Sequence, residues 1–150
     1  MNYLINKKNN LRQVSDKVPG SSKYMNILDD LLELFYQKDT AIVVDANLEK
    51  SRLEQTLNNH ENRNFRLYIG ISNRTEPLEV IWSLLHEYGH LLQRPPTDLE
   101  QTDGTPEKYE REKDAWRKAE DKFTEYSALC TYFDNFQAYR EFSESSYKPK

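Results

Sequence analysis

The chain has 150 residues, 25 acidic and 21 basic, with a formal net charge of −4. This length favours one domain, and the mild negative charge without a basic stripe argues against a dedicated nucleic-acid-binding protein. The single cysteine excludes an intramolecular disulfide and is typical of a reducing compartment. No apolar stretch approaches the roughly 18 residues that a membrane helix needs, and the first residues lack the apolar run of a secretory signal. We therefore expect a soluble, cytoplasmic protein with no membrane partner.

The first half of the chain predicts a polar arm, one helix and two strands. Residues 1–20 are polar and aperiodic, and we interpret them as a loosely ordered arm. Apolar residues recur at helical spacing over residues 22–35, and the β-branched run at 40–46 is typical of a buried strand. Residues 47–60 give only a weak helical signal. Apolar and polar residues alternate over 65–71, which predicts a half-buried strand.

The second half predicts two helices. The first runs over residues 77–93, with Thr75 as its N-cap, and ends before a pair of prolines. The second begins with a threonine cap and a first-turn proline, and its aromatic spacing continues from residue 105 to about 142. Together these elements predict an α+β fold with the arm, a single domain over residues 21–143 and a flexible tail over 144–150.

The first of these helices carries the sequence His86-Glu87-Tyr88-Gly89-His90, an H-E-x-x-H pattern. Residues four apart on a helix share a face, so both imidazoles can point at one metal ion, and zinc suits two imidazoles with a carboxylate. Glu87 projects about 100° round from His86, near enough to act on a metal-held water without being a ligand. A glycine inside a helix costs roughly 1 kcal/mol relative to alanine, which indicates that another backbone or a substrate approaches Gly89. The competing interpretation is that both histidines are ordinary helix residues.

A metal held by two histidines needs a third protein ligand. The remaining histidine, His60, lies in a polar, asparagine-rich segment, so a carboxylate of the second helix is favoured. At 100° per residue, Glu112 falls within the apolar stripe that contains Trp116, whereas Asp114 falls well away from it and Glu110 is farther than Glu112. An unpaired carboxylate on a buried face would be costly. We predict Glu112 as the ligand, with Asp114 and Glu110 as alternatives; the competing interpretation is that Glu112 is partly exposed and pairs with a Lys or Arg.

These two segments, HEYGHLLQ at 86–93 and EKDAWRKA at 112–119, resemble the gluzincin metallopeptidases, in particular the small ImmA/IrrE-type group. In that group the first motif is commonly H-E-x-G-H-x-L, and the second is a helical Glu-x-x-Ala followed four residues later by Ala or Gly. The resemblance implies a zincin-like minimal fold, in which a small sheet accompanies an active-site helix and a long C-terminal helix that carries the third ligand. It also implies that zinc is held by the two motif histidines and Glu112, with Glu87 as the catalytic base.

Two positions depart from the family pattern. Gluzincins often carry Asp or Asn after the alanine of the second motif, where it orients a zinc-binding histidine. In this chain that position is Trp116, and Lys118 stands where the family usually has an apolar residue. The support of the predicted ligands therefore differs from that of the family.

These features predict a zinc metalloendopeptidase acting on a protein or peptide substrate. Glu87 would take a proton from the attacking water and deliver it to the leaving amine. In zincins the strand before the metal helix is often an edge strand that pairs with the substrate, so we expect residues 65–71 to take that role. A tyrosine would help to stabilise the oxyanion, and Tyr109 and Tyr126 lie on the predicted ligand helix. The alternatives are a non-catalytic zincin-like domain that holds zinc for binding or regulation, and an interaction protein whose C-terminal helix docks a partner.

Overall fold

The structure is a computed structural model that describes residues 3–57, 63–74 and 76–149. The chain is mixed α+β, mostly helical with a three-stranded sheet, as the sequence predicted for the coarse class. It divides into two compact units, Met1–Leu84 and Leu85–Lys150. The single domain expected over residues 21–143 stays a prediction. None of the helices in the described part of the chain combines the length and apolar character that a membrane crossing requires.

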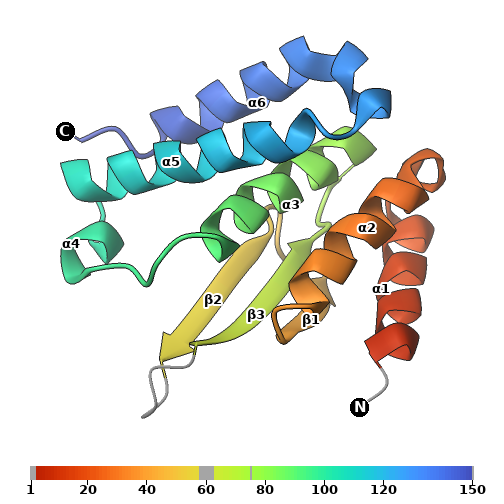
Figure 1. The fold of residues 1–150 in the computed structure, drawn as a ribbon. Coiled ribbons are helices and arrows are strands. Elements are labelled where there is room, and N and C mark those ends of the chain that lie inside the picture. Colours follow the sequence, from red (N-terminus) through yellow and green to blue (C-terminus); the bar gives the residue numbers. More distant parts are fainter. Residues whose placement is uncertain (1–2, 58–62, 75, 150) are drawn as a thin grey trace. The chain divides into compact units, whose positions relative to one another are not determined.

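The first unit contains a helical pair and the sheet (Figure 1). Its helices are α1 (Tyr3–Lys17), the 3-10 helix η1 (Ser21–Tyr24) and α2 (Met25–Tyr36). Its strands are β1 (Thr40–Asp45), β2 (Arg52–Leu57) and β3 (Arg63–Gly70). The strand order is β1-β3-β2, with β1 parallel and β2 antiparallel to β3. Helices α1 and α2 contact each other, and both contact β1.

The predicted loosely ordered arm over residues 1–20 is wrong, because most of it forms α1. Lys7 lies 3.0 Å from a carboxylate oxygen of Asp29 and 2.9 Å from one of Glu33, both on α2. Val14 is buried with 1% of its surface exposed. Tertiary contacts of this kind stabilise most helices in proteins. A helix held by ion pairs and a few buried residues shows little apolar periodicity in its sequence. This is why the polar composition of residues 1–20 suggests an arm.

Strand β3 is the centre of the described sheet, not an edge. Phe65, Leu67 and Ile69 are buried, so the predicted alternation is confirmed. However, β3 pairs with β1 on one side and β2 on the other. The expected role of residues 65–71 as a substrate-pairing edge strand is therefore wrong, because both rows of its backbone groups already have partners.

The weak helical signal over residues 47–60 is also wrong where the structure describes that segment, which contains β2. Residues 58–60, including His60, lie outside the described residues. Leu53 faces Leu67 of the central strand in the antiparallel register. This pairing, set by a strand that follows later in the chain, selects the extended form over a weak local preference.

Helix α3 (Pro77–Leu91) extends from the first unit into the second and carries the H-E-x-x-H pattern, as predicted. Its predicted cap, Thr75, lies outside the described residues. The second unit continues with a short helix, α4 (Asp98–Gln101), whose N-terminus has a capping box between Thr97 and Glu100. The remaining elements are α5 (Pro106–Phe123), the 3-10 helix η2 (Ser127–Tyr132) and α6 (Phe133–Ser145).

Helices α5 and α6 form an antiparallel pair, so the predicted single helix over 105–142 is wrong (Figure 1). Phe123 near the end of α5 packs on Phe133 at the start of α6, with ring centroids 5.8 Å apart, and Trp116 packs on Phe136 at 5.7 Å. The apolar spacing continues through both helices because each turns its stripe toward the other. A stripe that folds back on itself has the same sequence pattern as one long helix.

The tail predicted over residues 144–150 begins inside a helix, because α6 ends at Ser145. The next turn is hydrogen-bonded as well, with the Tyr147 amide donating to the Glu144 carbonyl at 3.0 Å. Tyr147 thereby follows α6 back toward the start of α5, where Lys108 Nζ lies 5.5 Å from its ring centroid.

Candidate metal centre

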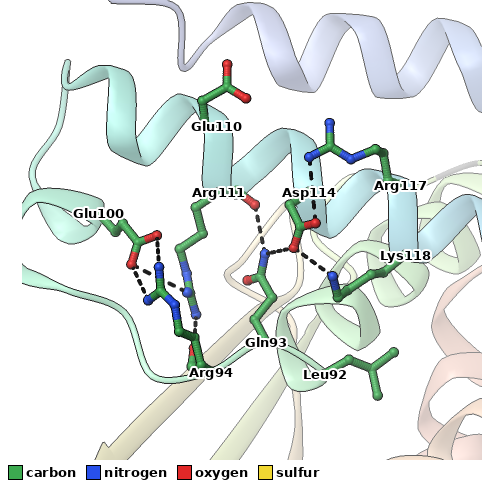
Figure 2. A pocket seen from close by; sticks show the side chains of 9 residues that line it. All are labelled: Leu92, Gln93, Arg94, Glu100, Glu110, Arg111, Asp114, Arg117 and Lys118. Carbon is green, nitrogen blue, oxygen red and sulfur yellow. Dashed lines mark hydrogen bonds and ion pairs between the residues drawn. The ribbon is translucent and has the colours of Figure 1, made fainter.

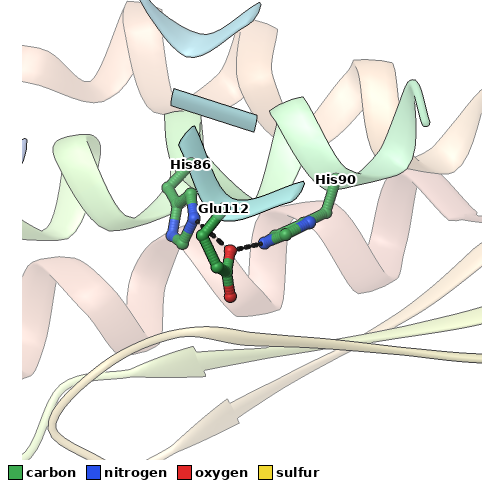
Figure 3. Close-up of side chains that lie close together, drawn as sticks. All are labelled: His86, His90 and Glu112. Carbon is green, nitrogen blue, oxygen red and sulfur yellow. Dashed lines mark hydrogen bonds and ion pairs between the residues drawn. The ribbon is translucent and has the colours of Figure 1, made fainter. Parts of the chain in front are cut away.

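The part of α3 that belongs to the second unit and helix α5 bring the three predicted ligands together (Figure 3). His86 Nε2 lies 3.1 Å from Glu112 Oε2, and His90 Nε2 lies 2.5 Å from the same oxygen. One ligand atom from each residue lies within 4.8 Å of the other two. Asp114 and Glu110, the alternatives for the third ligand, are not part of this cluster.

Two imidazoles and a carboxylate are donors that zinc accepts. Four tetrahedral ligands at about 2.0–2.1 Å from zinc lie about 3.3–3.4 Å from one another. The His86–Glu112 distance of 3.1 Å is already close to this value, and His90 needs to move by less than about 1 Å relative to Glu112. The Glu112 side chain is 10% exposed and faces two imidazoles. A carboxylate at such a position requires a cation.

Charge within the cluster is strongly coupled. Burial on its own would raise the pKa of Glu112, but hydrogen bonds and charges from the two imidazoles hold it well below its usual value. Burial would likewise lower the pKa of His90, but the hydrogen bond and charge of Glu112, together with Glu87 and Gln93, raise it to about 9. A proton on His90 therefore balances the buried carboxylate when no metal does.

Gly89 allows the two ligand-bearing helices to approach each other. A Cβ atom added at Gly89 would lie 2.1 Å from the carbonyl oxygen of Ala115 in α5. The prediction that another backbone approaches this glycine is confirmed. Ala115 follows Glu112 by about one helical turn, and Gly89 precedes His90, so this contact sets the spacing between ligands from the two helices.

Trp116 orients His86 by stacking. The two rings are nearly parallel, at 5°, with centroids 4.4 Å apart. The indole Nε1 is buried and has no hydrogen-bond acceptor among the residues that the structure describes. At the position where gluzincins often have a hydrogen-bonding Asp or Asn, this chain therefore uses a flat apolar surface. Lys118, the other departure, pairs with Asp114 at 2.8 Å.

Glu87, the predicted general base, is buried beside the cluster. It is 8% exposed, and its Oε1 lies 4.0 Å from Nδ1 of His86. It contributes no atom to the ligand cluster, in agreement with the helical geometry that separates it from the shared face of His86 and His90.

Tyr147 is a site residue that the sequence did not predict. Its pKa is raised by burial first, then by the negative charges of Glu112 and Glu87 and by a hydrogen bond to Glu112. Both carboxylates of the centre therefore act on the phenol electrostatically. The tyrosines suggested by sequence instead contact lysines: Tyr109 lies 5.1 Å from Lys113 and Tyr126 lies 5.4 Å from Lys122, from ring centroid to Nζ. Tyr147 lies near the centre because α6 runs back along α5, a tertiary feature that no local sequence pattern indicates.

A charged cavity of about 390 Å³ lies beside these helices (Figure 2). It is lined by Leu92, Gln93, Arg94, Glu100, Glu110, Arg111, Asp114, Arg117 and Lys118. The charges pair within its wall: Arg94 contacts both carboxylate oxygens of Glu100, at 2.7 and 2.9 Å, and Lys118 contacts Asp114. No local sequence pattern indicates this cavity, because its lining comes from the segment that follows α3, from α4 and from α5.

Comparison with known protein families, curated proteins and solved structures finds no match to this chain. The likeness to gluzincins therefore rests on the residues of the centre themselves.

Proposed function

We propose that this protein is a zinc-dependent metalloendopeptidase of zincin-like architecture that hydrolyses bonds in a protein or peptide substrate. The observation that carries the proposal is the convergence of His86, His90 and Glu112 at one buried point, with Glu87 beside it. A peptidase of this kind needs three protein ligands that leave a position open for water, together with a nearby base.

The residues of the centre divide into ligands and a base. His86, His90 and Glu112 would hold the ion, which when bound would supply a Lewis acid that polarises the scissile carbonyl and makes water more acidic. Glu87 would accept the proton of the attacking water and return it to the leaving amine. Its position suits this role, because it lies beside the ligand cluster without belonging to it.

Tyr147 is the candidate donor to the carbonyl oxygen as that oxygen gains negative charge. The phenol keeps its one proton beside two carboxylates, and its hydroxyl would turn from Glu112, to which it donates, to the carbonyl oxygen. Its contact with Glu112 places that donor next to a ligand of the centre.

The alternative is a non-catalytic domain of the same architecture that holds zinc without turnover. Two observations favour it: Trp116 replaces the hydrogen-bonding residue of the family, and the strand expected to pair with substrate already has neighbours on both sides. Cleavage distinguishes this alternative from the peptidase, and zinc content tests both.

The test combines metal analysis with cleavage of an unfolded protein substrate. Protein purified without added zinc should hold close to one zinc ion per chain. The Glu112→Gln variant should lose the ion, and the matched variant Glu110→Gln, on the same helix but outside the cluster, should keep it. Glu87→Gln should keep the ion and lose cleavage by about 10²–10⁴-fold. Zinc without cleavage in the unaltered protein would support the non-catalytic alternative, and absence of zinc would refute both.

A further inference from the structure

Gln93, two residues after the end of α3, contacts His90, Arg111 and Asp114 inside the second unit. Its Oε1 lies 2.7 Å from Nδ1 of His90. Its Nε2 donates to the backbone carbonyl of Arg111 at 2.9 Å and to Oδ2 of Asp114 at 2.9 Å (Figure 2). Gln93 is 6% exposed; its contact with the Arg111 carbonyl is buried, and its contacts with His90 and Asp114 are part-buried.

The partners fix the orientation of the amide. A backbone carbonyl can only accept, and the carboxylate of Asp114, which also contacts Lys118 at 2.8 Å and Arg117 at 3.6 Å, does the same. Both protons of the Gln93 amide nitrogen therefore have acceptors, and its oxygen faces His90. Because an amide oxygen donates nothing, the proton of this contact belongs to Nδ1 of His90.

This proton assignment determines what the other ring nitrogen can do. In a neutral imidazole only one nitrogen carries a proton, and the other presents a lone pair. With one proton held on Nδ1, the proton that leaves when metal binds is the one on Nε2, the nitrogen that faces Glu112 at 2.5 Å, and its departure presents the Nε2 lone pair to the metal. A fixed ring proton and ring plane raise the affinity of a histidine ligand, and loss of such support typically lowers metal affinity 10–100-fold.

We propose that Gln93 is a positioning residue that holds His90 ready to bind metal through Nε2, and that Asp114 acts on His90 through Gln93. The proposal rests on the proposed zinc site for its metal-binding consequence, but not for the hydrogen bond itself. It gives the two ligand histidines different supports, since His86 stacks on Trp116 whereas His90 is held by a hydrogen-bonded relay from α5. It also gives Asp114, an alternative third ligand on sequence grounds, a role outside the ligand set.

The variant Gln93→Met keeps the length of the side chain and removes both its hydrogen-bonding ends. We expect its zinc dissociation constant, measured by competition with a chromophoric chelator, to rise 10–100-fold. The matched control is Gln101→Met, because Gln101 is exposed and its amide donates to the Thr97 carbonyl, at 3.4 Å, rather than to a residue of the centre. The control should bind zinc within about twofold of the unaltered protein.

Variants at Asp114 separate positioning from packing. Asp114→Asn keeps a side-chain oxygen that can accept from the Gln93 amide, so this variant should retain most of the affinity. Asp114→Leu fills similar space without an acceptor and should lose affinity as Gln93→Met does. Equal losses in both Asp114 variants, with folding unchanged by circular dichroism, would overturn the relay.

A readout without metal completes the test. In metal-free protein labelled with [¹⁵N]histidine, the Nδ1 proton of His90 should give a slowly exchanging NMR signal that persists in Gln101→Met and disappears in Gln93→Met. Absence of this signal from the unaltered protein, or unchanged zinc affinity in folded Gln93→Met, would overturn the inference. If the signal is present but the unaltered protein does not bind zinc, the proposed function fails and the positioning of His90 stands. Should Gln93→Met not fold, the signal in Asp114→Leu decides: its loss supports the relay, and its persistence overturns it.

Discussion

Replacing Gly89 with alanine tests whether close approach of α3 and α5 builds the metal centre. The new Cβ would lie 2.1 Å from the Ala115 carbonyl oxygen, whereas ordinary contacts begin at 3.4 Å. The two helices must therefore move apart by about 1 Å, because a backbone carbonyl cannot rotate away as a side chain can. Separations of this size exceed the roughly 0.2 Å tolerance of zinc–ligand distances.

The expected stability change has two opposing contributions. Alanine is the better helix former by about 1 kcal/mol. Overpacking typically costs about 1–3 kcal/mol, and contact with rigid backbone belongs at the upper end. We expect Gly89→Ala to lower the free energy of unfolding by about 2 kcal/mol in urea denaturation with a chelator present, and to weaken zinc binding at least about tenfold.

Gly104→Ala is the matched control. Gly104 has φ +85°, and no atom of the described residues lies within 4 Å of an added Cβ, so alanine there would be strained without touching α3. This variant should lose about 1 kcal/mol of stability and keep its zinc affinity. A Gly89→Ala protein that is more stable than the unaltered chain and binds zinc equally well would refute the reasoning.

Three further predictions concern His90 and Tyr147. Zinc affinity should rise about tenfold per pH unit up to pH 9 and then level off, because the raised pKa of His90 means that one proton must leave before zinc binds. A flat affinity profile from pH 6.5 to 8.5 would contradict this prediction. In metal-free protein the same proton stabilises the fold fully below pH 6.5 and progressively less as pH rises through 9, which urea denaturation across this range measures. Tyr147→Phe should retain zinc and lower kcat by about 100-fold with little change in KM, and an unchanged kcat would remove Tyr147 from the role of oxyanion donor.

The clustering of His86, His90 and Glu112 can be predicted from sequence because it depends on local geometry. His86 and His90 share a face in any helix. Glu112 is identified once the aromatic residues of its helix show which face is buried. Gly89 is informative for a similar reason, since an unfavourable residue inside a helix indicates a close neighbour. These expectations require no knowledge of how the chain folds back.

The supports of the centre depend on tertiary contacts and are therefore not predictable from local patterns. Gln93 looks like an ordinary polar residue after a helix, and only the packing of α5 gives its amide two acceptors. Tyr147 falls in an expected tail because the α5–α6 turn has the same apolar spacing as a continuous helix. Helix α1 and strand β2 are not predicted for the same reason, because each is stabilised by contacts with segments elsewhere in the chain.

The connection between α3 and α5 has a consequence for how the centre assembles during folding. Only residues 91–111 separate His90 from Glu112, and loop closure becomes costlier by about 0.6 kcal/mol for each doubling of loop length. The capping box at Thr97 and the ion pairs of Glu100 further restrict this connection. Short-range contacts of this kind form early in folding. We expect a chain in which α6 has not yet docked to present all three ligands, so that zinc, if present during folding, would favour the productive encounter of the two helices.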